Sequence, residues 1–288
     1  MTDSRGAGLL VFGRTGQVAT ELARAAPGAA FLGRAEADLS DPGACAAAIR
    51  DRAPDAVINA AAWTAVDAAE TDEAAAHVVN ADAPAAMAAA CAARRVPFLH
   101  VSTDYVFDGS GEVPWREDDP TAPLGAYGRT KLAGERGVRD AGGPHAILRT
   151  SWVFSAHGSN FVRTMLRLSE TRDALSVVDD QVGGPTPAAD IAATLLALAD
   201  RLRDGHRGGT YHYGGAPPVS WAGFARETFR RAGRAVEVIG IPSSDYPTPA
   251  ARPLNSRLDG ARLLAEHGIA PPDWRAGLDA VLAELADG

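Results

Sequence analysis

The chain has 288 residues, with 36 acidic against 28 basic side chains and a formal net charge of −8. This length predicts one large or two modest domains with a sizeable core, and the acidic balance argues against a general nucleic-acid binder. No stretch approaches the roughly 18 apolar residues of a membrane span, and residues 1–16 lack a signal-peptide pattern. We therefore expect a cytoplasmic globular protein with no membrane or nucleic-acid partner.

Strands and helices alternate along the first half of the chain. Ser40 and Asp41, followed by Pro42, give one clear helix start. Alternation over about 150 residues predicts an α/β fold with a doubly wound, parallel Rossmann-type sheet and helices on both faces. We predict strands at 9–12, 29–32, 56–59, 97–102 and 146–149, and helices at 17–25, 42–52, 82–93 and 127–138.

The second half has amphipathic helices separated by loops rich in Gly and Pro. We predict helices at 160–170, 190–202 and 221–232, and strands at 177–178, 209–213 and 236–239. A dinucleotide-binding domain is expected over 1–150. A smaller C-terminal α/β substrate-binding lobe is expected mainly over 151–288, with some segments returning to the sheet.

A glycine-rich turn follows the first strand and opens the first helix. Its GxxGxxA pattern allows a tight turn and a close backbone approach to a pyrophosphate, and the helix start offers free N–H groups to the phosphates. A plain tight turn is the alternative reading. The predicted cofactor residues here are Gly13, Arg14, Thr15, Gly16, Gln17 and Val18.

The acidic residue expected about 20 positions further on is missing. Gly33 and Arg34 stand there instead, and an arginine can pair with a 2′-phosphate, which favours NADPH and leaves NADH open. A solvated surface side chain is the alternative interpretation of Arg34. Asp38 and Leu39 are predicted to contact the adenine.

Tyr127 and Lys131 form a YxxxK motif on a predicted helix, so both project from the same face. An ammonium nearby is expected to lower the pKa of Tyr127, which would make the phenol a usable acid. Ser102, Thr103 and Asp104 stand at the carboxyl end of the fourth strand, where ligands bind in open α/β sheets.

The cysteines and histidines do not indicate a disulfide framework or a metal site. Cys45 and Cys91 are expected to be buried free thiols in a reducing compartment. The seven histidines have no metal-ligand spacing, and His100, among apolar neighbours, is interpreted as structural. No GxSxG motif supports a hydrolase triad.

Several longer segments make the chain similar to the dTDP-4-dehydrorhamnose reductase family of extended short-chain dehydrogenases/reductases. The glycine turn and YxxxK belong to the whole superfamily, whereas STDYVFDG, RTSWVF and RPLNSRLD are far more specific. The matching segments are GRTGQVATEL at 13–22, VINAAAWTAVDAAE at 57–70, VNADAP at 79–84, HVSTDYVFDGSG at 100–111, PLGAYGRTKLAGE at 123–135, LRTSWVF at 148–154, NFVRTML at 160–166 and YPTPAARPLNSRLD at 246–259.

The resemblance implies reduction of the C4 ketone of a dTDP-4-dehydro-6-deoxy-L-sugar by NAD(P)H, giving dTDP-L-rhamnose. It implies that Tyr127 donates the proton, that Lys131 lowers the Tyr127 pKa and holds the nicotinamide ribose, and that Thr103 bonds the sugar O4. Further cofactor contacts are implied at Ala60, Ala61, Ala62, Thr64 and Ser102. Substrate contacts are implied at Val66, Asp104, Tyr105 and Trp152 for the sugar and at Asn160, Arg252 and Asn255 for the nucleotide end.

Several alternatives stay open. Some members dimerise through Mg²⁺, and Asp190 and Glu284 fall near those acidic positions, although solvated carboxylates without a metal are the simpler reading; a homodimer is not required. A ketoreductase for another nucleotide-deoxysugar or an epimerase would share this architecture. A dehydratase would need a second acid after Asp104, where Tyr105 stands. A regulatory dinucleotide-binding protein, like the regulatory subunit of methionine adenosyltransferase, is the non-catalytic alternative.

Overall fold

Six parallel strands form the central sheet of the computed structural model, which describes residues 6–287; residues 1–5 and 288, at the ends of the two expected domains, lie outside the described residues. The strand order is β10-β5-β4-β3-β1-β2, and every neighbouring pair is parallel. The predicted doubly wound α/β fold is thus confirmed. The strands are β1 (Leu9–Phe12), β2 (Ala30–Leu32), β3 (Ala56–Asn59), β4 (Phe98–Thr103), β5 (His145–Thr150) and β10 (Gly209–Tyr213).

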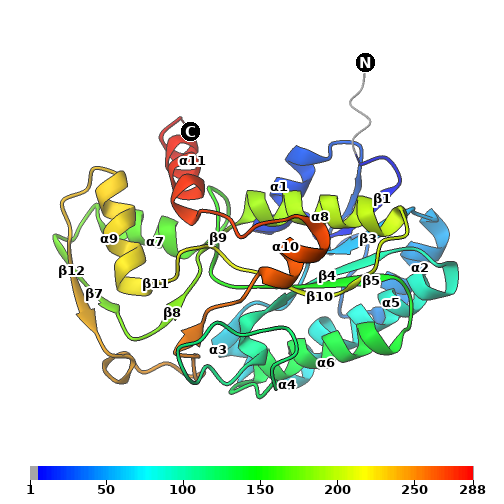
Figure 1. Cartoon of the computed structure of the whole chain (residues 1–288), viewed down its shortest axis with the longest axis horizontal. Coiled ribbons are helices and arrows are strands. Elements are labelled where there is room, and N and C mark those ends of the chain that lie inside the picture. The colour runs from blue at the N-terminus through cyan, green and yellow to red at the C-terminus, as the bar shows by residue number, and fades with distance from the viewer. Residues whose placement is uncertain (1–5, 288) are drawn as a thin grey trace.

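Helices cover both faces of this sheet (Figure 1). On β1, Leu9 and Val11 pack toward one face, and Leu10 and Phe12 pack toward the other. Burial on both faces explains why β1 is continuously apolar. The helices on the two faces are α1 (Gln17–Ala25) and α8 (Ala188–Arg203) on one, and α2 (Pro42–Arg52), α5 (Ala83–Arg94) and α6 (Ala126–Asp140) on the other.

The strand order reverses between β1 and β3. The chain passes from β1 to β2 on one side and then returns to β3 on the other. The carboxyl ends of strands at such a reversal form the usual ligand crevice of open α/β sheets. The glycine turn after β1 and the residues after β3 and β4 meet at this edge.

A smaller lobe lies beyond one end of the sheet (Figure 1). Its core contains Phe154, Phe224 and Trp274. Although β10, α8 and α10 (Ala261–His267) come late in the sequence, they pack with the sheet. The lobe contains α7 (Phe161–Leu168), α9 (Trp221–Arg231), α11 (Trp274–Asp287), β6 (Val153–Phe154), β7 (Ala174–Val178), β8 (Val182–Gly183), β9 (Thr186–Pro187), β11 (Val219–Ser220), β12 (Glu237–Ile241) and β13 (Asn255–Ser256).

The sequence analysis missed the shortest elements and two C-terminal helices. Helices α3 (Val66–Ala69) and α4 (Glu73–His77) are too short to establish a helical period, and a π-helical turn at Val78–Asp82 continues from α4 into α5. Helices α10 and α11 were also missed. A start signal for α11 was present, because the Asp273 carboxylate accepts the backbone N–H of Arg275.

The structure shows the state of the two cysteines and the length and polarity of the helices. Cys45 and Cys91 are free and buried, as predicted. Within residues 6–287, none of the helices has the length and apolar character needed to cross a membrane.

Candidate active site

The glycine turn has the backbone geometry that a dinucleotide site requires. Gly13 has φ +113°, and a Cβ placed there would lie 3.4 Å from the backbone of Ala60 and Ala61, so the turn needs glycine. Gly16 precedes α1 without a side-chain cap, and the first turn of α1 carries no acid. Unpaired N–H groups and the helix dipole therefore favour an anion, and these residues fit a cofactor pyrophosphate.

Gln17 of the turn also holds the two lobes together. The Gln17 Oε1 accepts hydrogen bonds from Ser155 Oγ (2.9 Å) and from Asn160 Nδ2 (3.0 Å). Val18 packs in the core beside α8. Asn160, predicted to hold the nucleotide end of the substrate, also caps α7 by accepting the Arg163 N–H. Its amide is thus already engaged within the protein.

The residues after β2 include Arg34 and Asp38, which were predicted to meet the adenosine half of the cofactor. The side chain of Arg34 is 89% exposed, and its Nε lies 3.8 Å from the Asp38 carboxylate. Arg14 pairs with Glu36 at 2.9 Å. Leu39 is buried in the core, so its side chain offers little surface to an adenine ring.

Helix α6 carries Tyr127 and Lys131 and is fixed by contacts from elsewhere in the chain. Its N-terminus has no cap of its own; instead the Glu70 carboxylate accepts the Ala126 N–H at 2.7 Å. The ring of Tyr127 makes an edge contact with that of Tyr105, with centroids 5.4 Å apart. The Lys131 ammonium donates to the Val101 carbonyl at 2.7 Å.

Thr103 lies against both Asp104 and Tyr127. Its hydroxyl donates to Asp104 Oδ1 at 3.0 Å, and its oxygen accepts the Tyr105 N–H at 3.2 Å. Burial raises the pKa of Asp104 to about 6 and lowers the pKa of Lys131 to about 8, against an opposing charge on Glu135. The predicted proton donor, cation and hydroxyl therefore stand together at the carboxyl end of β4.

The predicted direction of the Tyr127 pKa is wrong for this structure. Burial raises the pKa of Tyr127, the Asp104 carboxylate adds to that effect, and a hydrogen bond with Thr103 opposes it. Burial of the phenol, which sequence spacing cannot reveal, is the largest influence on this pKa. At neutral pH Tyr127 is thus a phenol that holds the proton it would donate.

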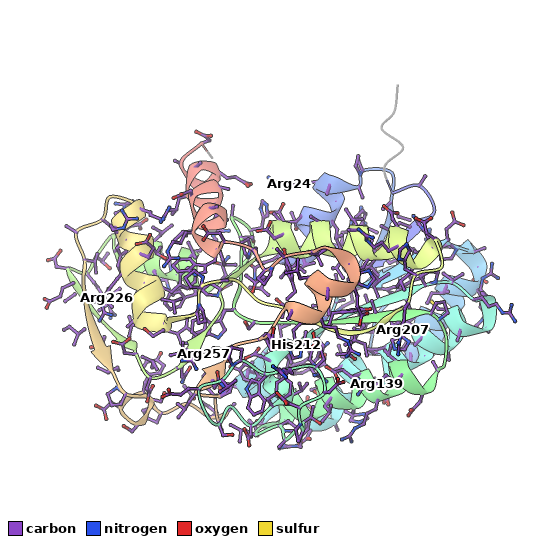
Figure 2. The ribbon with its side chains drawn as sticks, viewed as in Figure 1. Arg24, Arg139, Arg207, His212, Arg226 and Arg257 are labelled. Carbon is purple, nitrogen blue, oxygen red and sulfur yellow. The ribbon has the colours of Figure 1, made fainter. Side chains whose placement is uncertain are left out.

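A buried ionic network supports the base of this site. The Ser102 hydroxyl donates to Glu135 at 2.7 Å, so this predicted cofactor contact is engaged within the protein. Arg149 donates to Glu135 at 2.7 Å and to His212 Nε2 at 3.3 Å; His212 on β10 is labelled in Figure 2. Burial works to raise the pKa of Glu135, but Arg149 lowers it overall. Glu135 is therefore an anion that fixes α6 against β4 and β5.

Asn59, which the sequence analysis did not single out, and His100, which it interpreted as structural, form a buried contact with Lys131. Asn59 bonds His100 (3.2 Å between Nδ2 and Nδ1), and His100 Nε2 lies 3.2 Å from Lys131 Nζ. The purely structural interpretation of His100 therefore overlooked its contact with Lys131. An available signal was the position of Asn59 at the end of β3, where side chains meet the crevice.

The loop after β3 brings the predicted Ala60, Ala61, Ala62 and Thr64 to the crevice edge. The Ala61 N–H donates to Asn59 Oδ1 at 3.1 Å, and Thr64 is exposed. Further along this segment, the carboxylate of Asp67 is held by both terminal nitrogens of Arg252, at 3.2 and 3.0 Å. Arg252 thereby links the C-terminal lobe to the sheet.

The remaining predicted substrate residues are Val66, Trp152 and Asn255, and the polar group of Asn255 is already bonded within the protein. Val66 starts α3, and Trp152, at φ +50°, stacks on Trp221 with centroids 3.6 Å apart. Asn255 is 1% exposed, and its amide is engaged by Val113 and Arg257. It can therefore hold the loop around the site but offers no free group to a nucleotide.

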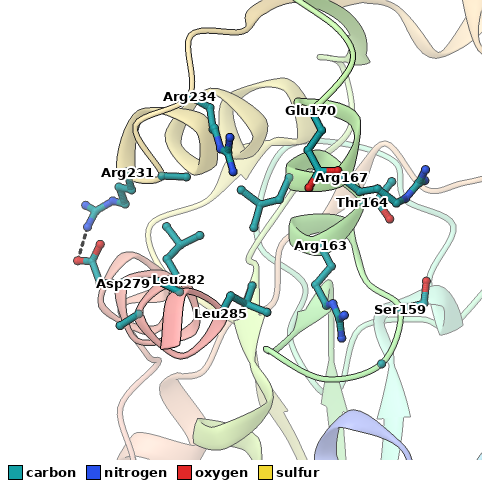
Figure 3. Close-up of a pocket in the computed structure, with 15 residues that line it drawn as sticks. Ser159, Arg163, Thr164, Arg167, Glu170, Arg231, Arg234, Asp279, Leu282 and Leu285 are labelled. Atoms are coloured by element: carbon teal, nitrogen blue, oxygen red, sulfur yellow. Dashed lines mark hydrogen bonds and ion pairs between the residues drawn. The ribbon is translucent and has the colours of Figure 1, made fainter. Parts of the chain in front are cut away.

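A hollow of about 860 Å³ lies away from these residues, between α7, α9 and α11 (Figure 3). Arg163, Arg167 and Arg234 line it, and Arg231 pairs with Asp279. It contains none of the predicted site residues. The predicted catalytic groups instead converge at the strand ends.

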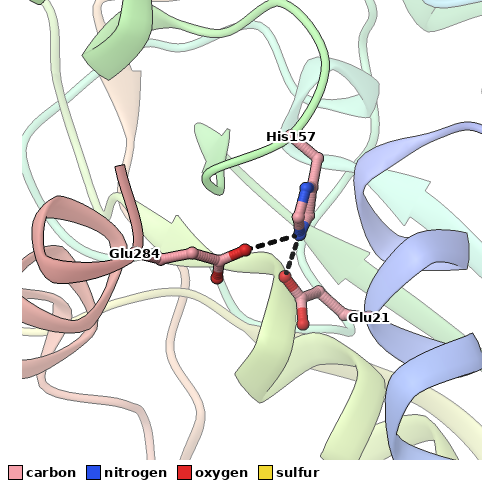
Figure 4. Close-up of side chains that lie close together, drawn as sticks. All are labelled: Glu21, His157 and Glu284. Carbon is pink, nitrogen blue, oxygen red and sulfur yellow. Dashed lines mark ion pairs between the residues drawn. The ribbon is translucent and has the colours of Figure 1, made fainter. Parts of the chain in front are cut away.

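Glu284, one of the two weak metal candidates, lies with Glu21 and His157, with one potential ligand atom from each within 4.8 Å of the others (Figure 4). Asp190 lines a second, separate hollow together with Glu21 and Glu284, but it stands outside this group of potential ligands. Arg24 already holds both oxygens of Glu284, at 2.8 and 2.5 Å, and Mg²⁺ prefers oxygen ligands to an imidazole. The donor set is thus a poor fit for Mg²⁺.

Comparison with known proteins identifies relatives of this fold and site. The family described as RmlD substrate binding domain matches residues 7–287. A dTDP-4-dehydrorhamnose reductase of Sinorhizobium fredii is 45% identical over 92% of this chain and 93% of the relative, and one of Burkholderia thailandensis is 46% identical over 96% and 98%.

Solved structures agree with the sequence relatives. A dTDP-4-dehydrorhamnose reductase of Clostridium acetobutylicum is similar at a TM-score of 0.91 and 35% identity, covering 96% of this chain and 99% of that one. One of Bacillus anthracis, in complex with NADP, is similar at a TM-score of 0.89 and 31% identity, covering 96% and 98%. A UDP-glucose 4-epimerase of Brucella ovis, at 19% identity, shares the fold alone. With a family match over nearly its whole length and relatives above 40% identity, the chain belongs to the RmlD substrate binding domain family of dTDP-4-dehydrorhamnose reductases.

Proposed function

We propose that this protein is an oxidoreductase that reduces the C4 ketone of dTDP-4-dehydrorhamnose to give dTDP-L-rhamnose, with NADPH as the reductant. The observation that carries the proposal is the convergence of Thr103, Tyr127 and Lys131 at the carboxyl end of β4, next to the glycine turn. Membership of the reductase family supports the substrate class.

The side chains of the site supply proton transfer and orientation. The hydride itself comes from the reduced nicotinamide when that cofactor is bound. Tyr127, a phenol at neutral pH, gives its proton to the alkoxide oxygen that forms at C4. Thr103 donates a hydrogen bond to the same oxygen, and a charged Lys131 stabilises the phenolate left on Tyr127.

The proposed cofactor contacts follow the edge of the sheet. The backbone at Gly13–Val18 would hold the pyrophosphate, because the start of α1 leaves its N–H groups free. Arg34 would pair with the 2′-phosphate of NADPH. The loop 60–64 and Lys131 would hold the nicotinamide half.

Val66, Tyr105 and Trp152 would surround the sugar. Arg252, close to the same crevice through its pair with Asp67, would face the nucleotide end and could exchange this carboxylate for a diphosphate. Consumption of NADPH in the presence of the 4-ketosugar nucleotide tests the proposed activity.

We also propose a cytoplasmic location and a homodimer. The free, buried Cys45 and Cys91 support a reducing, cytoplasmic setting. A homodimer remains a proposal, and light scattering of the purified protein, with and without added Mg²⁺, tests it.

A further inference from the structure

Four groups form a continuous series of contacts from the half-buried Ala61, in the loop after β3, to the buried amine of Lys131. The Ala61 N–H donates to Asn59 Oδ1 (3.1 Å), Asn59 Nδ2 meets His100 Nδ1 (3.2 Å), and His100 Nε2 meets Lys131 Nζ (3.2 Å). Asn59 and His100 are fully buried, and Lys131 is 2% exposed. Water therefore does not compete for the two contacts that join Asn59, His100 and Lys131.

The donor-to-acceptor direction of this hydrogen-bond series is fixed at Ala61. A backbone N–H can only donate, so the oxygen of Asn59 faces Ala61 and its NH₂ group donates to His100 Nδ1. Burial, with the nearby Lys131, lowers the pKa of His100 well below its ordinary value, so the ring is neutral. A neutral imidazole that accepts at Nδ1 carries its proton at Nε2, and that N–H points at Lys131.

This arrangement distinguishes the two charge states of Lys131. An ammonium has donors only, so it conflicts with the Nε2–H of His100. The uncharged amine accepts from that N–H while still donating to the Val101 carbonyl at 2.7 Å. We propose that Asn59 and His100 are positioning residues whose one-way hydrogen-bond relay stabilises the amine of Lys131 against its ammonium.

The other charged or titratable groups near Lys131 belong to its own helix and the adjoining strands. Glu135, one turn further along α6, favours the ammonium, but Arg149 from β5 and Ser102 from β4 already engage its oxygens. Asp104 and Tyr127 stand at the open side. Burial outweighs Glu135 and lowers the pKa of Lys131, and the relay would act in the same direction as burial.

The amino-acid composition also sets Lys131 apart. Lys131 is the sole lysine of the chain, and every other member of its 28 basic Lys and Arg side chains is an arginine. An arginine stays protonated, whereas a buried lysine can lose its charge near neutral pH. Resting on the proposed function, the relay makes phenolate stabilisation by Lys131 depend on pH, so kcat/KM falls as Lys131 is deprotonated.

Reversing the relay tests the inference. In Asn59→Asp, the carboxylate would accept from both Ala61 N–H and His100 Nδ1–H, which leaves Nε2 free to accept from the ammonium. The pKa of Lys131 should then rise by about one unit or more. The added negative charge alone would also raise it, so the same substitution is compared in a His100→Phe background, where no relay exists.

The readout needs neither cofactor nor substrate. Protein labelled with ¹³C-lysine gives a single lysine to follow by NMR titration. The inference predicts a lowered Lys131 pKa in the wild type and a larger effect of Asn59→Asp with His100 present than without it. His267→Gln, which changes another buried histidine, is the matched control and should leave the titration unchanged.

Two results would overturn the relay: an unshifted lysine pKa in the wild type, or equal effects of Asn59→Asp in both backgrounds. If His100→Phe fails to fold, His100→Gln replaces it, because its amide oxygen can accept from the ammonium and should raise the pKa. The alkaline limb of kcat/KM should move with the NMR value. A protein that lacks reductase activity but shows the NMR coupling would refute the proposed function and leave the relay intact.

Discussion

The position of Tyr127 depends on the absence of a side chain at Gly128. A Cβ at Gly128 would lie 2.2 Å from the Tyr105 carbonyl oxygen and 2.9 Å from the Pro123 Cβ. Relieving this contact requires a shift of about 1 Å between α6 and the turn after β4, and misplacement on that scale costs roughly 10²-fold in rate. Gly128→Ala should therefore lower kcat by about two orders of magnitude.

Stability should change much less than activity. The alanine gains about 1 kcal/mol of helix propensity, which offsets part of an overpacking cost of about 1–3 kcal/mol. Steady-state kinetics and thermal unfolding would be measured together, with Gly43→Ala in α2 as a control remote from the site. A folded Gly128→Ala enzyme with kcat within about twofold of wild type would refute the argument that this contact positions the acid.

Three further outcomes follow from the site. Tyr127→Phe should lower kcat by roughly 10²-fold or more while NADPH affinity is kept; full activity would show that Tyr127 is not the acid. Arg34→Ala should lower kcat/KM for NADPH about tenfold relative to NADH, and an unchanged ratio would argue against a 2′-phosphate contact. Folding raises the pKa of Asp104 from 3.8 to about 6, so its favourable contribution is present below pH 4 and is lost as pH rises through 6. Asp104→Asn should thus stabilise the protein by up to about 3 kcal/mol at pH 8 and little at pH 4, and denaturant unfolding without a gain at pH 8 would contradict this.

The Rossmann half could be predicted because its signals are local. Apolar runs of strand length alternate with helical stretches, and the glycine turn and YxxxK each lie within a few residues. The convergence of Thr103 with Tyr127 and Lys131 followed from strand polarity, since ligand sites gather at the carboxyl ends of parallel strands.

The features that were missed depend on contacts between distant segments. Asn59, His100 and Lys131 come from β3, β4 and α6, and no spacing rule joins them. Gln17 and Asn160, which lie 143 residues apart, meet only once the lobes are packed. The pKa direction of Tyr127 failed for a related reason, because desolvation depends on everything that covers a group.

The central claim is tested most directly by following NADPH consumption with the 4-ketosugar nucleotide generated in place by a 4,6-dehydratase, with and without a 3,5-epimerase. The proposed function predicts rapid consumption that requires the epimerase and is lost in Tyr127→Phe. Consumption without the epimerase, or none despite demonstrated NADPH binding, would contradict the assignment of dTDP-4-dehydrorhamnose as the substrate.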